Sequence, residues 1–298
     1  MSTQLLFRAP AIESAKINNL WFQLSNTACN LSCSHCFLSC STDKKMKKFL
    51  PLDKIKTALE QAKQLDVKEI YLTGGEPFLH PDLNNILRMS LKLANVVVLT
   101  NGTFINDKKA RFLRQIEVES NNELIFRVSL DHYTQEKNDV LRGKGVFRKV
   151  MSCVENLVKY GFNPIISTVN YWNEDEDSIK AGFSKLFSEI DFNLEEINFK
   201  IIPTIKGGEY AKNYGTYAEQ DYVTHEDLAK IKKPRFDCTN SRILSVDGVF
   251  SCPMLVGDPR GKVGSALNDM RRSVFLETGV CKTCVSCNRA LLNNNWSV

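Results

Sequence analysis

Six short apolar segments alternate with helical patterns along most of the sequence, and this alternation limits the possible folds more than any other feature. Apolar residues recur at helical spacing after Pro51, after "HPD" at 80–82, before Gly161 and after the acidic "NEDED" at 173–177. Strands that alternate with helices favour a parallel α/β sheet, and six such units are too few for a closed eightfold barrel. The predicted strands are residues 20–24, 69–72, 96–100, 123–130, 164–169 and 196–202.

The length and composition of the chain are those of a globular protein. Its 298 residues, 43% of them hydrophobic, can form one large core, or one core with a small appended module. A net charge of +5 is too weak to indicate nucleic acid as a partner. No apolar run is long enough for a signal peptide or for the roughly 18 residues of a membrane span. We therefore expect a cytoplasmic protein with neither nucleic acid nor a membrane as a partner.

Polar and cysteine residues follow the predicted strands at the points where the strands end. A cysteine-rich loop follows the first strand, "TGGEP" at 73–77 the second, "NGT" at 101–103 the third, "DH" at 131–132 the fourth and Asn170 the fifth. In parallel α/β folds, ligands bind at the carboxyl ends of the strands. The sequence therefore predicts a functional rim at this end of the sheet.

The ten cysteines fall mainly into two groups. Disulfides are rare in a reducing compartment, so clustered thiols more often bind metal or carry out redox chemistry, and two groups predict two metal sites. In the first group, His35 or Cys40 could complete a structural zinc site, whereas three thiolates on an iron–sulfur cubane leave one iron open for catalysis. The first group is Cys29, Cys33, Cys36 and Cys40; the second is Cys238, Cys252, Cys281, Cys284 and Cys287.

The spacing Cys29-x₃-Cys33-x₂-Cys36 after the first strand, together with "GGEP" after the second, resembles the radical S-adenosylmethionine (SAM) superfamily. The resemblance covers about residues 18–205 and implies a six-stranded partial (β/α)6 barrel of the TIM type. It also implies that the three cysteines hold a [4Fe-4S] cluster whose open iron binds SAM. Reductive cleavage of SAM would then give methionine and a 5′-deoxyadenosyl radical that abstracts a hydrogen from the substrate.

The same resemblance implies which residues bind SAM. The turn formed by Gly74, Gly75, Glu76 and Pro77 would present a carbonyl and a carboxylate to the amino group of SAM, since adjacent glycines permit close backbone approach. His35 occupies the aromatic position near the adenine, although a solvent-facing loop histidine is an equal alternative.

Further polar residues are candidates for contacts with SAM or the substrate. The guanidinium of Arg142 can pair with the SAM carboxylate, or can be a solvated charge before a helix. The other candidates lie at strand ends, where such residues also cap helices and close turns. They are Asn101, Ser129, Asp131 and Asn170, of which we favour Ser129 and Asn170. No residue is predicted to act as a catalytic acid, base or nucleophile.

The last quarter of the sequence resembles the auxiliary-cluster domains called SPASM and twitch. A hairpin signal in "RILSVDGVFSC" lies between Cys238 and Cys252. Spacing alone leaves zinc, a second cluster and disulfides open. The resemblance implies one auxiliary [4Fe-4S] cluster, held by Cys238, Cys252, Cys281 and either Cys284 or Cys287. The predicted organisation is an N-terminal extension (1–17), the partial barrel (18–205), a linker (206–235) and an auxiliary-cluster domain (236–298).

These features predict a radical SAM enzyme of the oxidoreductase or maturase type, with a flavodoxin- or ferredoxin-type electron donor. Only about 17 residues precede the first strand, which leaves no room for a leader-binding domain and favours a small molecule from a natural-product or cofactor pathway. The alternative substrate is a ribosomally made peptide that is epimerised or cross-linked. The alternative from another class is a non-enzymatic binding module stapled by zinc.

Overall fold

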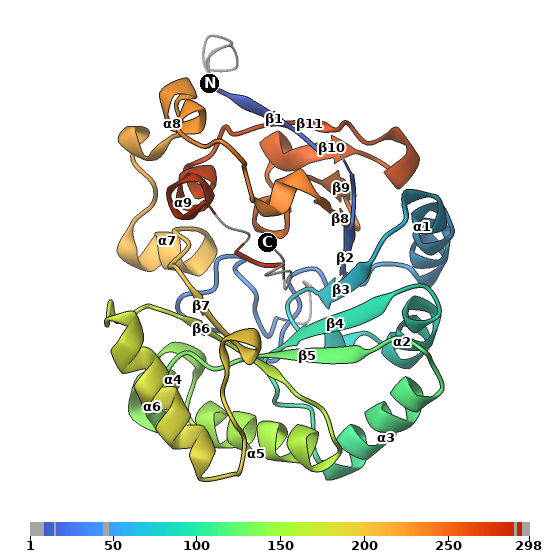
Figure 1. Ribbon diagram of the computed structural model, residues 1–298, viewed down its shortest axis with the longest axis vertical. Coiled ribbons are helices and arrows are strands. Elements are labelled where there is room, and N and C mark those ends of the chain that lie inside the picture. The colour runs from blue at the N-terminus through green and yellow to red at the C-terminus, as the bar shows by residue number, and fades with distance from the viewer. Residues whose placement is uncertain (1–8, 15, 44–47, 289–290, 294–298) are drawn as a thin grey trace.

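The main feature of the fold is a sheet whose central strands are parallel and follow one another in chain order (Figure 1). The computed structural model describes residues 9–14, 16–43, 48–288 and 291–293. Each of the six predicted strands overlaps a parallel strand of this sheet. These strands are β2 (Asn19–Gln23), β3 (Glu69–Thr73), β4 (Asn95–Thr100), β5 (Leu124–Ser129), β6 (Ile165–Val169) and β7 (Phe199–Ile202).

Helices connect these strands and cover the outer side of the sheet (Figure 1). The four helices expected from apolar periodicity are present as α1, α2, α5 and α6, whereas α3 and α4 lie in charged segments and were not predicted. Helix α3 buries Leu113 and Ile116 among lysines and arginines, and the Asn106 side chain caps it by accepting from the Lys109 amide. The helices are α1 (Leu52–Leu65), α2 (Leu83–Leu91), α3 (Asp107–Val118), α4 (Gln135–Arg142), α5 (Val146–Lys159) and α6 (Glu176–Ser188).

The cysteine-rich C-terminal segment extends the same sheet. Strands β8 (Ser241–Ser245) and β9 (Gly248–Phe250) form the predicted hairpin, with Ser245 opposite Gly248. Strand β8 also pairs in parallel with β2, so the described sheet has nine strands in the order β10-β9-β8-β2-β3-β4-β5-β6-β7. The sheet thus differs from the expected six-stranded barrel, because β8 covers the edge of β2 that six strands alone would leave unpaired. Strand β10 (Lys262–Gly264) forms the edge of the sheet on this side, and β7 forms the opposite edge.

The segment predicted to be a linker contains helices α7 (Gly208–Tyr214) and α8 (His225–Ala229). Helix α7 packs on the cysteine loop, where the Glu209 amide donates to the Cys36 carbonyl at 2.8 Å. Gly208 has a φ of +54°, and a Cβ there would lie 2.4 Å from that carbonyl oxygen, so a glycine permits the contact. The linker region therefore helps to position the loop.

Two further contacts join the chain ends to the core. Strand β1 (Ala11–Glu13), in the predicted N-terminal extension, pairs antiparallel with β11 (Ser273–Phe275). Residues 291–293, which we call the wall segment, are fixed by the Asp237 carboxylate, which accepts hydrogen bonds from all three of their backbone amides. No helix within the described residues has the length and apolar character of a membrane span.

Candidate active site

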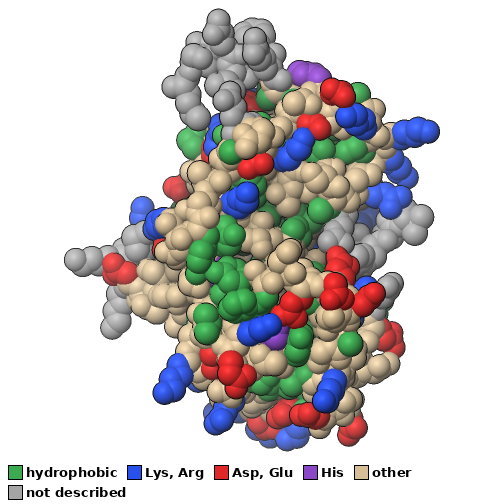
Figure 2. Space-filling view, turned by 90° about the vertical axis from the view of Figure 1, so that its left-hand side faces the viewer, with side chains coloured by type: hydrophobic (Ala, Val, Ile, Leu, Met, Phe, Trp, Pro, Cys, Tyr) green, Lys and Arg blue, Asp and Glu red, His purple; other side chains and the backbone are tan. Residues whose placement is uncertain are grey.

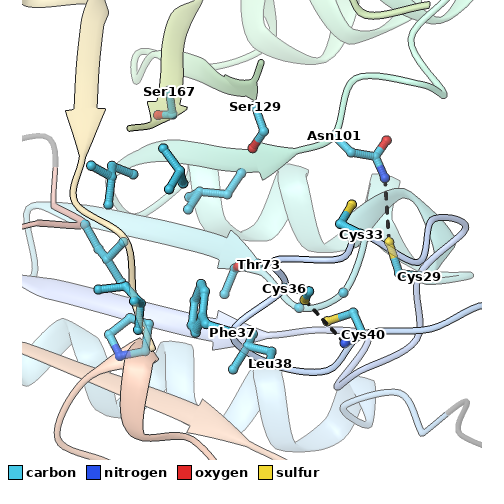
Figure 3. Close-up of a pocket in the computed structure, with 18 of the residues that line it drawn as sticks. Cys29, Cys33, Cys36, Phe37, Leu38, Cys40, Thr73, Asn101, Ser129 and Ser167 are labelled. Atoms are coloured by element: carbon cyan, nitrogen blue, oxygen red, sulfur yellow. Dashed lines mark hydrogen bonds between the residues drawn. The ribbon is translucent and has the colours of Figure 1, made fainter. Parts of the chain in front are cut away.

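A cavity of about 210 Å³ lies at the carboxyl ends of the central strands, where the sequence predicts the functional rim. The cysteine loop forms one side of it (Figure 3). The other sides are formed by residues from strands β2 to β8, from the segments that follow β7 and Cys252, and from the wall segment. Most of the predicted site residues line this cavity. They are Cys29, Cys33, His35, Cys36, Gly74, Gly75, Asn101, Ser129, Asp131 and Arg142, together with Cys40.

Backbone contacts hold the cysteine loop in a compact form. The Cys29 amide donates to the Ser41 carbonyl at 3.0 Å, and the Cys40 amide donates to the Cys36 sulfur at 3.3 Å. Figure 3 shows Cys36 beside Cys40, while Cys29 and Cys33 lie on the side of Asn101. All ten cysteines are free thiols. The loop therefore presents the three predicted ligand thiols, and that of Cys40, to one cavity without a disulfide.

The thiols of the loop differ in acidity. A hydrogen bond from the Cys40 side chain lowers the pKa of Cys36 to about 6, whereas burial raises the pKa of Cys33 to about 12. No three His, Cys, Asp or Glu side chains among the described residues surround a single ion position. Three thiols on the wall of a larger cavity have the donor chemistry of an iron–sulfur site. The loop residues thus fit the predicted cluster.

Asp131 joins two predicted site residues that come from different elements. Its Oδ2 accepts from His35 Nε2 at 2.9 Å and from Arg142 Nε at 2.5 Å, while Oδ1 accepts from the Val169 amide at 3.1 Å. Burial alone would raise the pKa of Asp131, but the charges of Arg142 and His35 hold it well below its ordinary value. The Nδ1 atom of His35 is buried without a partner among the described residues. His35 is therefore oriented by Asp131 and faces the cavity rather than solvent.

The "GGEP" turn packs directly on the start of the cysteine loop. A Cβ on Gly75 would lie 2.1 Å from the Ala28 carbonyl oxygen, and one on Gly74 would lie 2.5 Å from Ser25 Oγ. Gly74 also has a φ of +146°, which favours glycine. Both glycines are thus needed for the turn to approach the loop.

The Glu76 carboxylate is fully buried and is bound by the protein itself. It accepts from Thr100 Oγ1 and the Asn101 amide, both at 2.8 Å, and from the Phe78 amide at 3.1 Å. Burial raises its pKa to about 7. Gly74 and Gly75 line the cavity, whereas Glu76 and Pro77 do not, so the contact of the Glu76 carboxylate with SAM stays a prediction.

The rim residues divide into two kinds. Asn101 lines the cavity, and its Nδ2 donates to the Cys29 sulfur at 3.7 Å (Figure 3). Ser129 also lines it. Asn170 does not, because its side chain closes a turn by accepting from the Glu174 amide at 3.0 Å and donating to the Glu174 carbonyl at 2.8 Å. The structure thus gives Asn170 the turn-closing role that was the alternative reading.

Several cavity residues were not predicted from the sequence. Arg127 and Ser167 point inward from β5 and β6, Met254 follows Cys252, and Leu292 belongs to the wall segment. The position of Arg127 could have been predicted from the sequence, because it lies two residues before Ser129 on the same strand and therefore faces the same side of the sheet. The other three depend on contacts between distant parts of the chain.

The second cysteine group lines a separate cavity of about 20 Å³. Cys238, Cys252, Cys281 and Cys284 face it, and burial raises the pKa of all four thiols. Cys281 and Cys284 are one turn apart on α9 (Gly279–Cys287), whereas Cys287 is exposed and turned by about 120° from Cys281. Met254 lines both cavities, so the two adjoin each other at this residue.

Comparison with known proteins agrees with this geometry. The family model described as the radical SAM superfamily matches residues 25–180, just over half of the chain. The chain is 31% identical over 142 residues to "Antilisterial bacteriocin subtilosin biosynthesis protein AlbA" of Bacillus subtilis, covering 47% of this chain but only 30% of AlbA. It is 25% identical over 254 residues to a GTP 3′,8-cyclase of Clostridium perfringens, covering 81% of this chain and 71% of that protein.

A solved structure shares the fold. The structure of Streptococcus suis SuiB bound to its precursor peptide SuiA superimposes with a TM-score of 0.62 at 17% sequence identity. The match covers 86% of this chain and 64% of SuiB. The chain therefore spans less than two thirds of the length of both AlbA and SuiB.

Proposed function

Because the chain belongs to the radical SAM superfamily, whose members use a [4Fe-4S] cluster and SAM, we propose that it cleaves SAM reductively and abstracts a hydrogen atom from a substrate. One observation carries this proposal: the three cysteines of the loop and the glycines of the "GGEP" turn share one cavity, which adjoins a pocket of four cysteines at Met254. When bound, the cluster and SAM supply an electron and a 5′-deoxyadenosyl radical that removes the substrate hydrogen.

The residues of the chain have the following roles in this proposal. Cys29, Cys33 and Cys36 hold the cluster. Arg142 provides positive charge beside two of these thiols, since it lowers the pKa of Cys33 against the effect of burial. The pKa of Arg142 itself is raised first by Asp131 and then by Cys33 and Cys29. His35, oriented by Asp131, contacts the adenine of SAM.

We assign the auxiliary [4Fe-4S] cluster to Cys238, Cys252, Cys281 and Cys284, because these four thiols face one pocket and Cys287 is exposed. Four protein ligands leave no iron open for substrate. The proposed role of this cluster is therefore to accept an electron from the substrate across Met254, which lines both cavities, rather than to anchor the substrate.

The proposed substrate is a peptide. The name of AlbA and the complex of SuiB with SuiA favour a peptide over the small molecule expected from the sequence. A small molecule is the second candidate, because a GTP 3′,8-cyclase matches more of the chain than AlbA does. The proposal includes a flavodoxin- or ferredoxin-type electron donor and a cytoplasmic location.

Metal analysis of anaerobically purified and reconstituted protein tests the proposal. We expect about eight irons and eight sulfides per chain, the content of two cubanes. We also expect dithionite to drive conversion of SAM to 5′-deoxyadenosine. About four irons per chain would mean that the protein holds only one cubane, which would contradict the proposed auxiliary cluster. Zinc without sulfide would instead identify the zinc-stapled binding module.

A further inference from the structure

Arg127 is a buried arginine on the wall of the active-site cavity. It lies on β5, is only 2% exposed and lines the cavity with Ser129, which follows it by two residues on the same face of the strand. The rise of a β-strand places Arg127 about 7 Å deeper in the barrel than Ser129. It therefore lies beneath the rim of cysteines and glycines to which we assign the cluster and SAM.

The hydrogen-bond partners of Arg127 carry no charge. Its Nε donates to Ser167 Oγ at 2.5 Å, and its Nη1 donates to the Leu292 carbonyl of the wall segment. Burial lowers the pKa of Arg127 to about 10, so the side chain is a cation at neutral pH. The acidic groups whose charges act on it are Tyr71 and then Asp237, and the Asp237 carboxylate is already bound to three backbone amides.

Arg127 and Arg142, the two arginines that line the cavity, differ in whether a carboxylate pairs with them. Within the described part of the chain, Arg142 forms an ion pair with Asp131, whereas Arg127 forms none with any carboxylate. Buried charges in proteins are normally paired, and an uncompensated one is costly. Because Arg127 faces a cavity, an anion entering from the cavity can supply the missing charge.

The chemistry of the site indicates the kind of anion. The planar guanidinium binds a carboxylate through two parallel hydrogen bonds. Hydroxyl groups of Ser129 and Ser167 line the same cavity and can donate further hydrogen bonds. Apolar side chains around them, among them Val169 and Ile202, make the pocket suitable for a group that is apolar with one acidic end.

We propose that Arg127 binds a carboxylate of the substrate, so that the substrate is an acid. For a peptide, the carboxylate is an Asp or Glu side chain or a free C-terminus; for a small molecule, it is a carboxylic acid. This inference rests on the proposed function, because it assumes that SAM occupies the rim above Arg127. The carboxylate of SAM is the competing source of the same chemistry, and the experiment separates the two.

Acetate and acetamide are matched probes for this site, since they differ in charge but hardly in shape. We expect saturation-transfer NMR on the cluster-loaded full chain, saturated with SAM, to show acetate binding about tenfold more tightly than acetamide. Equal binding of the two probes to the wild type would overturn the inference without use of any variant.

Variants assign the binding to Arg127. Arg127→Gln should remove the preference for acetate while SAM still saturates the protein, and Arg127→Lys should restore part of it. Arg148→Gln is the matched control, because Arg148 is exposed on α5 and bonds only Gln135. If Arg127→Gln weakens SAM binding by the same factor as it weakens acetate binding, then Arg127 binds the SAM carboxylate, and the inference is overturned.

The same samples separate failure of the inference from failure of the proposed function. Iron and sulfide content and SAM saturation are measured before each titration. Protein that lacks clusters or does not bind SAM contradicts the proposed function. Protein that has both clusters and SAM but shows no preference for acetate contradicts only the role of Arg127.

Discussion

The two cysteine groups of this protein have very different surroundings. The loop cysteines line a cavity of about 210 Å³ together with the polar side chains of Asn101, Asp131 and Arg142, and Cys33 and Cys36 are partly exposed. The four C-terminal cysteines line a cavity of about 20 Å³ with mostly apolar neighbours, and none is more than 8% exposed.

This difference indicates different tasks. Three thiols beside open space and charged groups suit a metal site that exchanges ligands, whereas four buried thiols suit one that only stores and passes electrons. Burial raises the pKa of the four C-terminal thiols, so they are protonated at neutral pH until metal binding deprotonates them. We call the pocket of these four thiols the closed site and the cavity of the loop cysteines the open site. Metal binding at the closed site should therefore release protons, and its affinity should depend on pH.

The largest expected effect is that of Cys33→Ala, which removes a proposed ligand of the open site, the cavity lined by Cys29, Cys33 and Cys36. We expect loss of 5′-deoxyadenosine formation to background and a fall in iron from about eight to about four per chain, with the fold retained. Chromatographic assay of SAM cleavage and circular dichroism measure these quantities. Dithionite-dependent cleavage that persists in this variant would contradict the ligand assignment.

Cys252→Ala removes a proposed ligand of the closed site and should separate SAM cleavage from electron transfer. Iron should again fall to about four per chain, but SAM cleavage should remain close to that of the wild type while formation of product stops. A parallel assay of 5′-deoxyadenosine and product checks this. Equal loss of both activities would mean that the closed site is needed for the fold of the open one.

A pair of variants on α9 sharpens the description of the closed site. Cys284→Ala should lower iron to about four per chain, whereas Cys287→Ala should leave about eight, because only Cys284 faces the pocket. Iron analysis and electron paramagnetic resonance of the reduced protein compare the two. The reverse result would show that Cys287 is the fourth ligand.

The smallest expected effect concerns Glu76 at the base of the open site. Because burial raises its pKa from 4.5 to about 7, the folded apoprotein binds this proton more tightly than the unfolded chain does. Stability should therefore fall as pH rises, by about 2 to 3 kcal/mol between pH 5 and pH 8 from this group alone.

Glu76→Gln should remove this contribution and flatten the pH profile. Urea unfolding of the apoprotein at pH 5 and pH 8 measures the difference for both forms, with Glu136→Gln, on exposed surface of α4, as the control. If the unfolding free energy changes equally between pH 5 and pH 8 in Glu76→Gln and in the wild type, then another titrating group causes the pH dependence.

The central strands and most of the site could be predicted because their signals are local. Strands buried on both faces read as continuous apolar runs, and the spacing of Cys29, Cys33 and Cys36 lies within one loop. The position of a residue at a strand end predicts that it lies on the rim but not where its side chain points. Ser129 therefore lines the cavity, while Asn170 closes a turn.

The features that could not be predicted depend on pairing between distant segments. Nothing local to β8 shows that it pairs with β2, and the expectation of a separate auxiliary domain follows from the resemblance of the last quarter of the sequence to SPASM and twitch domains. The sequence left open whether Cys284 or Cys287 is the fourth ligand. This choice depends on which face of α9 is buried, and only the packing of the helix shows that face. Arg127 could have been recognised as a charge on the inward face of an apolar strand.

The contacts of the wall segment have a consequence for the order of events during synthesis. Trp21 Nε1 donates to Asn293 Oδ1, which lies 272 residues later in the chain, and Arg127 donates to the carbonyl of Leu292. A chain that emerges from the ribosome N-terminus first has made its cysteine loop long before this wall exists. We therefore expect the cavity beside the loop to stay open on that side until residues 291–293 dock, and we expect cluster loading to be easiest in this period.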